Sequence, residues 1–369
     1  MAGRVPGALN DPAALDTTTL WIGTSTAELG GSGHGIERVR VNDSSAPKHE
    51  PPIPAHSPSF LAAHPALPVL YAVEESTGNL VVLDVARESV RWLGPPQYAC
   101  ELPCHIHVDP RGRYLVVSGW GDGTIALFDL SPDGRPLLRD RVGLEGTVPP
   151  RAHSATTVRE GKIATVDIAN DSICFWRLDE TEGMVSEYAL DLPAMSGPRH
   201  LKVHGDGLVY VVTEYSGCVF VLRAGRAGRF TIAGSAPLRP HGTWSRTDLA
   251  AEITITDLGS ATFAHVGVRG SDTIVTMRVA PNRTDLVAID EVSCHGITPR
   301  HHTTVGSRLY VANRASNSIA VFQLGPSGLP THRGDVDVGS PSCVVVMNDD
   351  VPAGPLRRGD SLGARIRHS

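Results

Sequence analysis

Two arginines, Arg199 and Arg300, interrupt a sequence pattern that is otherwise built from small residues. The pattern is a three-residue unit that recurs before apolar segments, and its other middle residues are Ser59, Cys104, Ala152, Ala251 and Ser342. A guanidinium offers a planar fork of donors that matches a carboxylate or a phosphate. The two arginines therefore predict an anion-binding site. The alternative is that they are solvated or paired with structural carboxylates.

The third position of the same unit is rich in histidine. It holds Phe60, His105, His153, His200, Glu252, His301 and Cys343. Histidines that recur in one column are expected to share a structural role, such as bonding backbone groups of neighbouring repeats. His153 differs because its neighbours Ala152 and Ser154 are small, which would leave its ring reachable. A reachable imidazole titrates near neutral pH and can act as a general base, so a structural and a catalytic role are both open for His153.

Charged residues recur at one further place, the expected end of the second strand of each repeat. These positions hold Glu75, Trp120, Ile168, Glu214, Arg269 and Arg314. Exposed strand ends are often charged, so this column alone does not separate a binding rim from a solvated edge. Glu214 belongs to the same repeat as Arg199, and we expect the two side chains to pair.

Short strands in a regular repeat must position these residues. The third positions of successive units lie 42 to 52 residues apart, and periods of about 40–50 residues are typical of propeller blades. Turns such as residues 109–112 separate β-branched and aliphatic runs. We predict an all-β, seven-bladed β-propeller in which a strand at 343–346 pairs with one at 20–24 and closes the ring.

The topology of such a blade brings the two columns together. The innermost and third strands run in the same direction, so the loop that enters the first and the turn that enters the third open on one face. Both columns should therefore surround one mouth of the central channel. We expect residues 1–18 to be an N-terminal extension, 19–347 the propeller, and 348–369 a polar, disordered tail. The stretch 223–249, with His241 and Trp244, is a candidate to shape the mouth.

Composition narrows the class of function. The chain has 369 residues, of which 41% are hydrophobic, and its net charge of −6 argues against a nucleic-acid partner. Six dispersed cysteines form no CxxC pair, which favours buried free thiols in a reducing cytoplasm. No signal peptide and no apolar run of about 20 residues is evident, so no membrane partner is expected. We expect a monomer or a small homo-oligomer.

The segments that carry these residues resemble the lactonase family of seven-bladed β-propellers, of the 6-phosphogluconolactonase and carboxy-muconate cyclase type. The matching segments follow one another along nearly the whole chain, at residues 22–24, 103–106, 109–114, 197–201, 212–214, 299–300, 311–313, 321–322 and 341–345. The chain departs from the family where Arg151 replaces the first histidine of Pro-His-x-His, and where Val268 precedes Arg269 in place of asparagine.

The resemblance implies an active site at His153, Arg199, Glu214 and Arg300, and an enzyme that opens a small anionic lactone. In this hypothesis His153 is the general base, the two arginines hold the anion and stabilise oxyanion charge, and Glu214 orients an arginine or the histidine. Further substrate contacts are expected from Arg269, Arg314, Glu75 and Trp120. Neither a cofactor nor a metal is expected. Two alternatives remain: a cyclase or isomerase of an unsaturated carboxylate that uses the same residues, and a non-catalytic propeller that serves as a binding scaffold.

Overall fold

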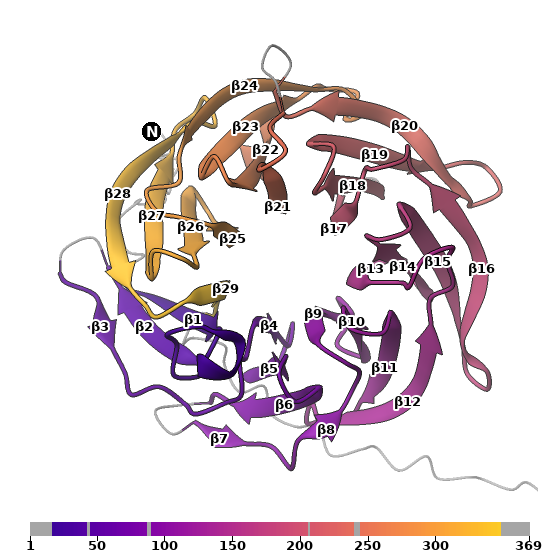
Figure 1. The fold of residues 1–369 in the computed structure, drawn as a ribbon, viewed down its shortest axis with the longest axis horizontal. Coiled ribbons are helices and arrows are strands. Elements are labelled where there is room, and N and C mark those ends of the chain that lie inside the picture. Colours follow the sequence, from indigo (N-terminus) through magenta and orange to yellow (C-terminus); the bar gives the residue numbers. More distant parts are fainter. Residues whose placement is uncertain (1–16, 43–44, 87–89, 206, 240–243, 348–369) are drawn as a thin grey trace, which may run out of the picture.

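The computed structural model describes residues 17–42, 45–86, 90–205, 207–239 and 244–347, which form a closed ring of seven β-sheets (Figure 1). Six sheets have four strands and one has five. The prediction of an all-β, seven-bladed propeller is confirmed. Residues 1–16 of the expected N-terminal extension and the expected tail at 348–369 lie outside the described residues.

The strands are arranged in four concentric rows. The innermost row consists of β29 (Pro341–Val346), β4 (Phe60–Ala63), β9 (Pro103–Val108), β13 (Ala152–Arg159), β17 (Pro198–His204), β21 (Leu249–Leu258) and β25 (Pro299–Val305). The second row consists of β1 (Thr18–Thr24), β5 (Val69–Glu74), β10 (Tyr114–Gly119), β14 (Lys162–Asp167), β18 (Leu208–Thr213), β22 (Ala261–Arg269) and β26 (Arg308–Asn313).

The two outer rows complete the blades. The third row consists of β2 (Glu37–Val41), β6 (Asn79–Asp84), β11 (Thr124–Leu130), β15 (Ser172–Asp179), β19 (Cys218–Ala224), β23 (Thr273–Val279) and β27 (Ser318–Leu324). The outer row consists of β3 (Lys48–His49), β7 (Arg91–Trp92) with β8 (Gln97–Tyr98), β12 (Pro136–Gly143), β16 (Gly183–Asp191), β20 (Phe230–Pro237), β24 (Leu286–Ser293) and β28 (Pro330–Asp337).

The ring is closed by its two ends, as the sequence predicts. Strand β29 pairs antiparallel with β1, with Leu20 opposite Val346 and Ile22 opposite Val344. The first blade is thus built from both ends of the described chain. Pairing with β29 gives β1 an inner partner, so the edge of β1 is not left as a template for edge-to-edge aggregation.

The hydrophobic core lies between neighbouring blades. All six residues of β18 are buried, because the sheet is covered by another blade on each of its faces. Tyr210 and Val212 pack toward Val266 and Met277 of the next blade. Double coverage explains why second-row strands such as β18 are continuous apolar runs. Outer strands such as β20 are mostly exposed.

Turn chemistry fixes the strand ends. In the predicted turn at 109–112, the Asp109 carboxylate accepts the backbone N–H groups of Arg111 and Arg113, and Gly112 adopts a φ of 67°. The one helical element among the described residues is the 3₁₀ turn η1 (Ala27–Leu29), between β1 and β2. No helix in the described part of the chain is long and apolar enough to cross a bilayer.

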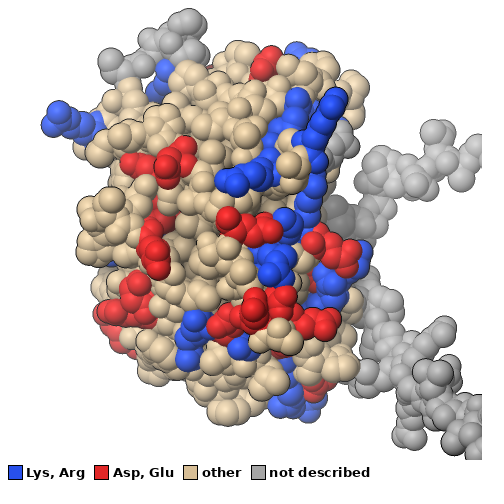
Figure 2. Space-filling view, turned by 90° about the vertical axis from the view of Figure 1, so that its right-hand side faces the viewer, with Lys and Arg blue, Asp and Glu red and all other residues tan. Residues whose placement is uncertain are grey.

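The cysteines are free, and charges of both signs lie on the outer surface. All six thiols are free; four are buried and two, Cys174 and Cys218, are partly buried. The side of the ring that carries β16 shows acidic and basic side chains interspersed (Figure 2). The charges that matter for the site lie instead at the inner rim.

Candidate functional site

The recurring three-residue unit is a β-bulge at the start of the innermost strand. In β17, Pro198 lies opposite Thr213 and His200 opposite Val212, so Arg199 is an extra residue without a cross-strand partner. Arg300 is the extra residue of β25 in the same way. A bulge re-aims the side chain of the extra residue and bends the strand. The side chains of Arg199 and Arg300 therefore point in a direction that the regular strand pairing would not give them.

The bulges place the two predicted columns at one end of the blades. Because β17 and β18 are antiparallel, the start of β17 meets the end of β18, and Glu214 directly follows that strand. His153 stands in the corresponding bulge of β13. His153, Arg199, Glu214 and Arg300 thus lie at the same end of their respective blades, at one mouth of the channel.

A buried ion-pair cluster forms there around Glu214. The Nε of Arg199 lies 2.9 Å from Oε2 of Glu214, and Nη2 of Arg269 lies 2.6 Å from the same oxygen. The expected pairing of Glu214 with Arg199 is present, and Arg269 of the next blade is a second partner. Arg199 is only 2% exposed. One carboxylate faces two guanidiniums, so the cluster carries excess positive charge.

The Arg199 guanidinium has spare donor capacity. Its Nη1 is buried and has no hydrogen-bond partner among the described residues. An unsatisfied buried donor costs about 1–3 kcal/mol. Burial, followed by the charges of Arg269 and Arg300, lowers the pKa of Arg199 to about 9, which leaves the group protonated at neutral pH. An anionic oxygen at Nη1 would satisfy this donor and balance the charge.

His153 is more buried than its small neighbours suggest. It is 5% exposed, because the edge of Trp120 lies at a ring-centroid distance of 5.9 Å and His200 at 5.1 Å. Burial and then Arg199 hold the pKa of His153 well below its ordinary value, so the imidazole is neutral at pH 7. Its Nδ1 is buried without a hydrogen-bond partner in the described structure. Glu214 engages the arginines rather than this histidine.

The remaining histidines of the third column lie close to one another on the innermost strands. Phe60 and His105 have ring centroids 4.5 Å apart, and His105 lies 5.4 Å from His200. The expected bond to a backbone group of a neighbouring blade is found for His301, whose Nδ1 accepts the N–H of Val344. His200 instead bonds a side chain, since its Nδ1 lies 2.6 Å from Oε2 of Glu252.

The other expected substrate contacts divide into two groups. Trp120 lies beside His153 and carries the Arg151 guanidinium over its indole at 4.9 Å, so the departure at Arg151 places a cation next to the site. Arg314 turns toward the β1–β2 connection, where Nε donates to Ser25 Oγ at 3.1 Å. Burial lowers the pKa of Arg314, Arg300 lowers it further and Glu75 opposes both effects, so Glu75, Arg300 and Arg314 are electrostatic neighbours.

Sequence reasoning missed two contributors. The sequence pattern marks Glu252 as the only acidic residue of the third column, but it does not predict that Glu252 contacts histidines. Tyr215 follows Glu214 and is 36% exposed; burial raises its pKa, and Glu214 raises it further. Trp244 of the stretch 223–249 packs against Gly217, while His241 lies outside the described residues.

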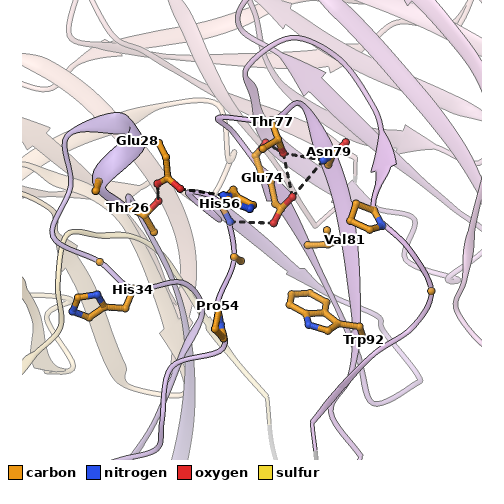
Figure 3. A pocket seen from close by; sticks show the side chains of 15 residues that line it. Thr26, Glu28, His34, Pro54, His56, Glu74, Thr77, Asn79, Val81 and Trp92 are labelled. Carbon is orange, nitrogen blue, oxygen red and sulfur yellow. Dashed lines mark hydrogen bonds and ion pairs between the residues drawn. The ribbon is translucent and has the colours of Figure 1, made fainter.

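A cavity lies away from this cluster, between blades 1 and 2 (Figure 3). It has a volume of about 770 Å³ and is lined by Glu28, His56, Glu74 and Trp92 among others. The Nδ1 of His56 lies 3.0 Å from Glu28, and Glu74 accepts the His56 N–H. Its lining contains two carboxylates and neither lysine nor arginine, so it would repel an anion. The chemistry favours the arginine-lined rim.

The chain is similar to known proteins in both sequence and structure. The family model described as "Lactonase, 7-bladed beta-propeller" matches residues 19–346. The 6-phosphogluconolactonase of Bacillus subtilis (strain 168) is 24% identical over 328 residues, which cover 82% of this chain and 90% of that protein.

Two solved structures share the architecture. The periplasmic gluconolactonase PpgL of Pseudomonas aeruginosa has a TM-score of 0.80 and 24% identity, and the match covers 90% of this chain and 99% of that one. A putative 6-phosphogluconolactonase from Bacteroides uniformis ATCC 8492 has a TM-score of 0.79 and 25% identity, with 90% and 100% covered. The similarity therefore extends over the whole propeller.

Proposed function

Because this chain belongs to the lactonase family of seven-bladed β-propellers, we propose that its arginine-lined rim binds a small anionic lactone and hydrolyses it. The observation that carries the proposal is the buried Arg199 guanidinium, whose Nη1 has no partner among the described residues and stands beside a neutral histidine. The name of the Bacillus relative, a 6-phosphogluconolactonase, supports a lactone of a phosphorylated sugar acid as the first compound to test.

The arginines supply binding and charge stabilisation. Arg199 and Arg300 hold the anionic substituent, and the excess positive charge around Glu214 favours a ligand that brings negative charge. Negative charge also develops on the carbonyl oxygen when water adds to the lactone. Donors that are already in place stabilise that charge without reorganisation, and the loss of one such donor costs about 10²–10³ in rate.

His153 moves the proton. The water oxygen bonds to the lactone carbonyl carbon while the imidazole takes the proton of the water. The ring C–O bond then breaks, and the departing alkoxide takes the proton back from the imidazolium, which yields the hydroxy acid. Burial and Arg199 lower the pKa of free His153. An anion held by the arginines raises this pKa, so substrate binding strengthens the base.

A panel of lactones tests the proposal. Phosphorylated and unphosphorylated sugar lactones are assayed, with and without a chelator, using the native protein, Arg199→Ala and the surface control Arg226→Ala. We expect the native protein to hydrolyse an anionic lactone at a rate that the chelator does not change. Arg199→Ala should lower this rate by about 10²–10³, and Arg226→Ala should leave it unchanged. Full activity of Arg199→Ala would overturn the anion site.

The same panel separates the alternatives. Formation of a lactone from a muconate-type acid, with no hydrolysis of sugar lactones, would favour the cyclase. Absence of turnover with every compound, together with binding of a macromolecule at another face, would favour the scaffold.

A further inference from the structure

Glu252 is a buried acceptor on the innermost strand β21, which lines the channel. It stands in the bulge of β21 and is 8% exposed. Its Oε1 accepts the backbone N–H of Ile253 at 3.0 Å, and its Oε2 lies 2.6 Å from Nδ1 of His200 and 3.4 Å from Nε2 of His301. Three donors converge on one side chain, which is the arrangement that suits an ionised carboxylate.

The backbone and the carboxylate fix which nitrogen of each ring carries the proton. The N–H of Val344 donates to Nδ1 of His301, so the proton of neutral His301 is on Nε2, facing Glu252. Glu252 likewise requires the proton of His200 to be on Nδ1. The Nε2 of His200 is then unprotonated and has a free lone pair, and no group in the described residues donates to it.

The nearest group in need of an acceptor is His153. Its Nδ1 is buried without a partner among the described residues, and its ring centroid lies 5.1 Å from that of His200. This separation is close to that of two imidazoles joined by an N–H···N hydrogen bond. The Nδ1 of His105 is also buried without a partner among the described residues. The His105 ring lies farther from His200, at 5.4 Å, and makes an edge contact with it, so His153 is the better placed donor.

The structure shows the two rings in contact but not hydrogen-bonded, so the His153 ring must rotate to bring Nδ1 onto Nε2 of His200. We propose that it does so, and that His153, His200 and Glu252 then form a hydrogen-bonded chain in which His200 and Glu252 are positioning residues for the base. Nδ1–H of His153 donates to Nε2 of His200, and Nδ1–H of His200 donates to Glu252. The lone pair of His153 is then on Nε2 and is available to the attacking water. The inference rests on the proposed function for its kinetic consequence, but not for the chain itself.

The chain holds its protons in place during the reaction. The proton of water goes to Nε2 of His153 and returns from there to the alkoxide, so no proton needs to reach Glu252. While His153 is an imidazolium, the negative charge of Glu252 acts through His200 to stabilise it. The same logic applies where a buried carboxylate orients a catalytic histidine.

The groups around His153 and His200 are mostly cations, whose effect on the pKa of His153 is opposite to that of Glu252. The charged and titratable groups that face His153 and His200 from other strands are Arg199, Arg269, Arg300, Lys202 and His105. The cations among them disfavour an imidazolium. Without the Glu252 charge the pKa of His153 falls further, so the acidic limb of the pH–rate profile moves to lower pH while the rate at its plateau drops.

Kinetics of Glu252→Gln form the first arm of the test. We expect kcat to fall about 10-fold or more while KM changes little, and the acidic limb to move to lower pH. Glu252→Asp, which keeps the charge, should restore part of the rate. The matched control is His302→Gln, because His302 is a buried histidine outside the chain that bonds the backbone carbonyl of His265. It should lower stability but leave kcat and the limb unchanged.

Nitrogen NMR of the imidazoles forms the second arm and needs no substrate. The ring of His153 is identified from the spectrum of ¹⁵N-histidine-labelled protein by its disappearance in His153→Gln. We expect a proton on Nδ1 of His153 in the native protein and in Glu252→Asp. We expect loss of this preference in Glu252→Leu, which offers no acceptor for the Nδ1–H of His200. An unchanged tautomer in a folded Glu252→Leu protein overturns the chain. If no lactone is hydrolysed but the tautomer responds, the proposed function fails and the chain stands.

Discussion

Arg199 and Glu214 form a buried ion pair, with Nε of the guanidinium 2.9 Å from Oε2 of the carboxylate. The pair joins the start of β17 to the residue that follows β18, and Arg269 from the next blade shares the same oxygen. Glu214 therefore balances two cations in a site from which water is largely excluded. Its first role is electrostatic support of the arginines.

Glu214→Gln should destabilise the protein. The substitution leaves Arg199 and Arg269 buried without their counter-charge, and breaking a buried pair costs about 3–5 kcal/mol. Urea unfolding measures the loss. Inorganic phosphate should raise the unfolding midpoint of this variant more than that of the native protein, because the site becomes more positive. The exposed pair Lys162–Glu187 supplies the control, since Glu187→Gln should change the free energy of unfolding by less than about 1 kcal/mol.

His153→Ala should lower kcat by about 10²–10⁴ and change KM little, because the imidazole transfers a proton in the transition state but binds no charge of the substrate. Steady-state kinetics on the best lactone measure both constants. His295→Ala, at an exposed surface histidine, serves as control. A rise in KM at unchanged kcat would assign His153 to binding.

Arg300 should respond differently from His153. An anion clamp binds the substrate and the developing oxyanion, so Arg300→Ala should raise KM and lower kcat together, with kcat reduced by about 10²–10³. Arg300→Lys keeps the charge but loses the planar fork, and should fall between the native protein and the alanine variant. Equal kcat/KM for Arg300→Lys and Arg300→Ala would argue against a charge role at this position.

The sequence predicted the propeller well because one physical unit recurs. Each blade needs the same bulge, strands and turns, so small residues mark the bulge and Arg199 and Arg300 stand out against them. The pairing of Arg199 with Glu214 was accessible for the same reason, since both belong to one blade. Local rules within a blade were sufficient for these predictions.

Contacts between blades were not accessible in that way. Glu252 and His200 lie on different blades, and their meeting depends on how far each bulge turns its side chain toward the channel axis. The burial of His153 has the same origin, because Trp120 and His200 from neighbouring blades cover it while its own neighbours are small. Register shifts and the curvature of the ring determine these contacts, and neither can be predicted from the spacing of the repeat.

Histidines that are withdrawn from water also make stability depend on pH, and the partly buried His107 gives the clearest case. Its Nε2 accepts the backbone N–H of Thr157 at 2.9 Å, which requires an unprotonated nitrogen. Burial lowers the pKa of His107 to about 4, against about 6.5 in the unfolded chain. Between these values the unfolded state binds more protons than the folded state, so the free energy of unfolding falls as pH falls.

Urea unfolding between pH 7 and pH 4 should therefore show a loss of stability that begins near pH 6.5. His107 contributes about 1.4 kcal/mol per pH unit within that window. In His107→Gln the amide oxygen still accepts the Thr157 N–H, but the side chain no longer titrates. The slope in this variant should be smaller than that of the native protein by about the same amount. An identical slope in the two proteins would show that His107 is already protonated in the folded state, and that burial does not depress its pKa.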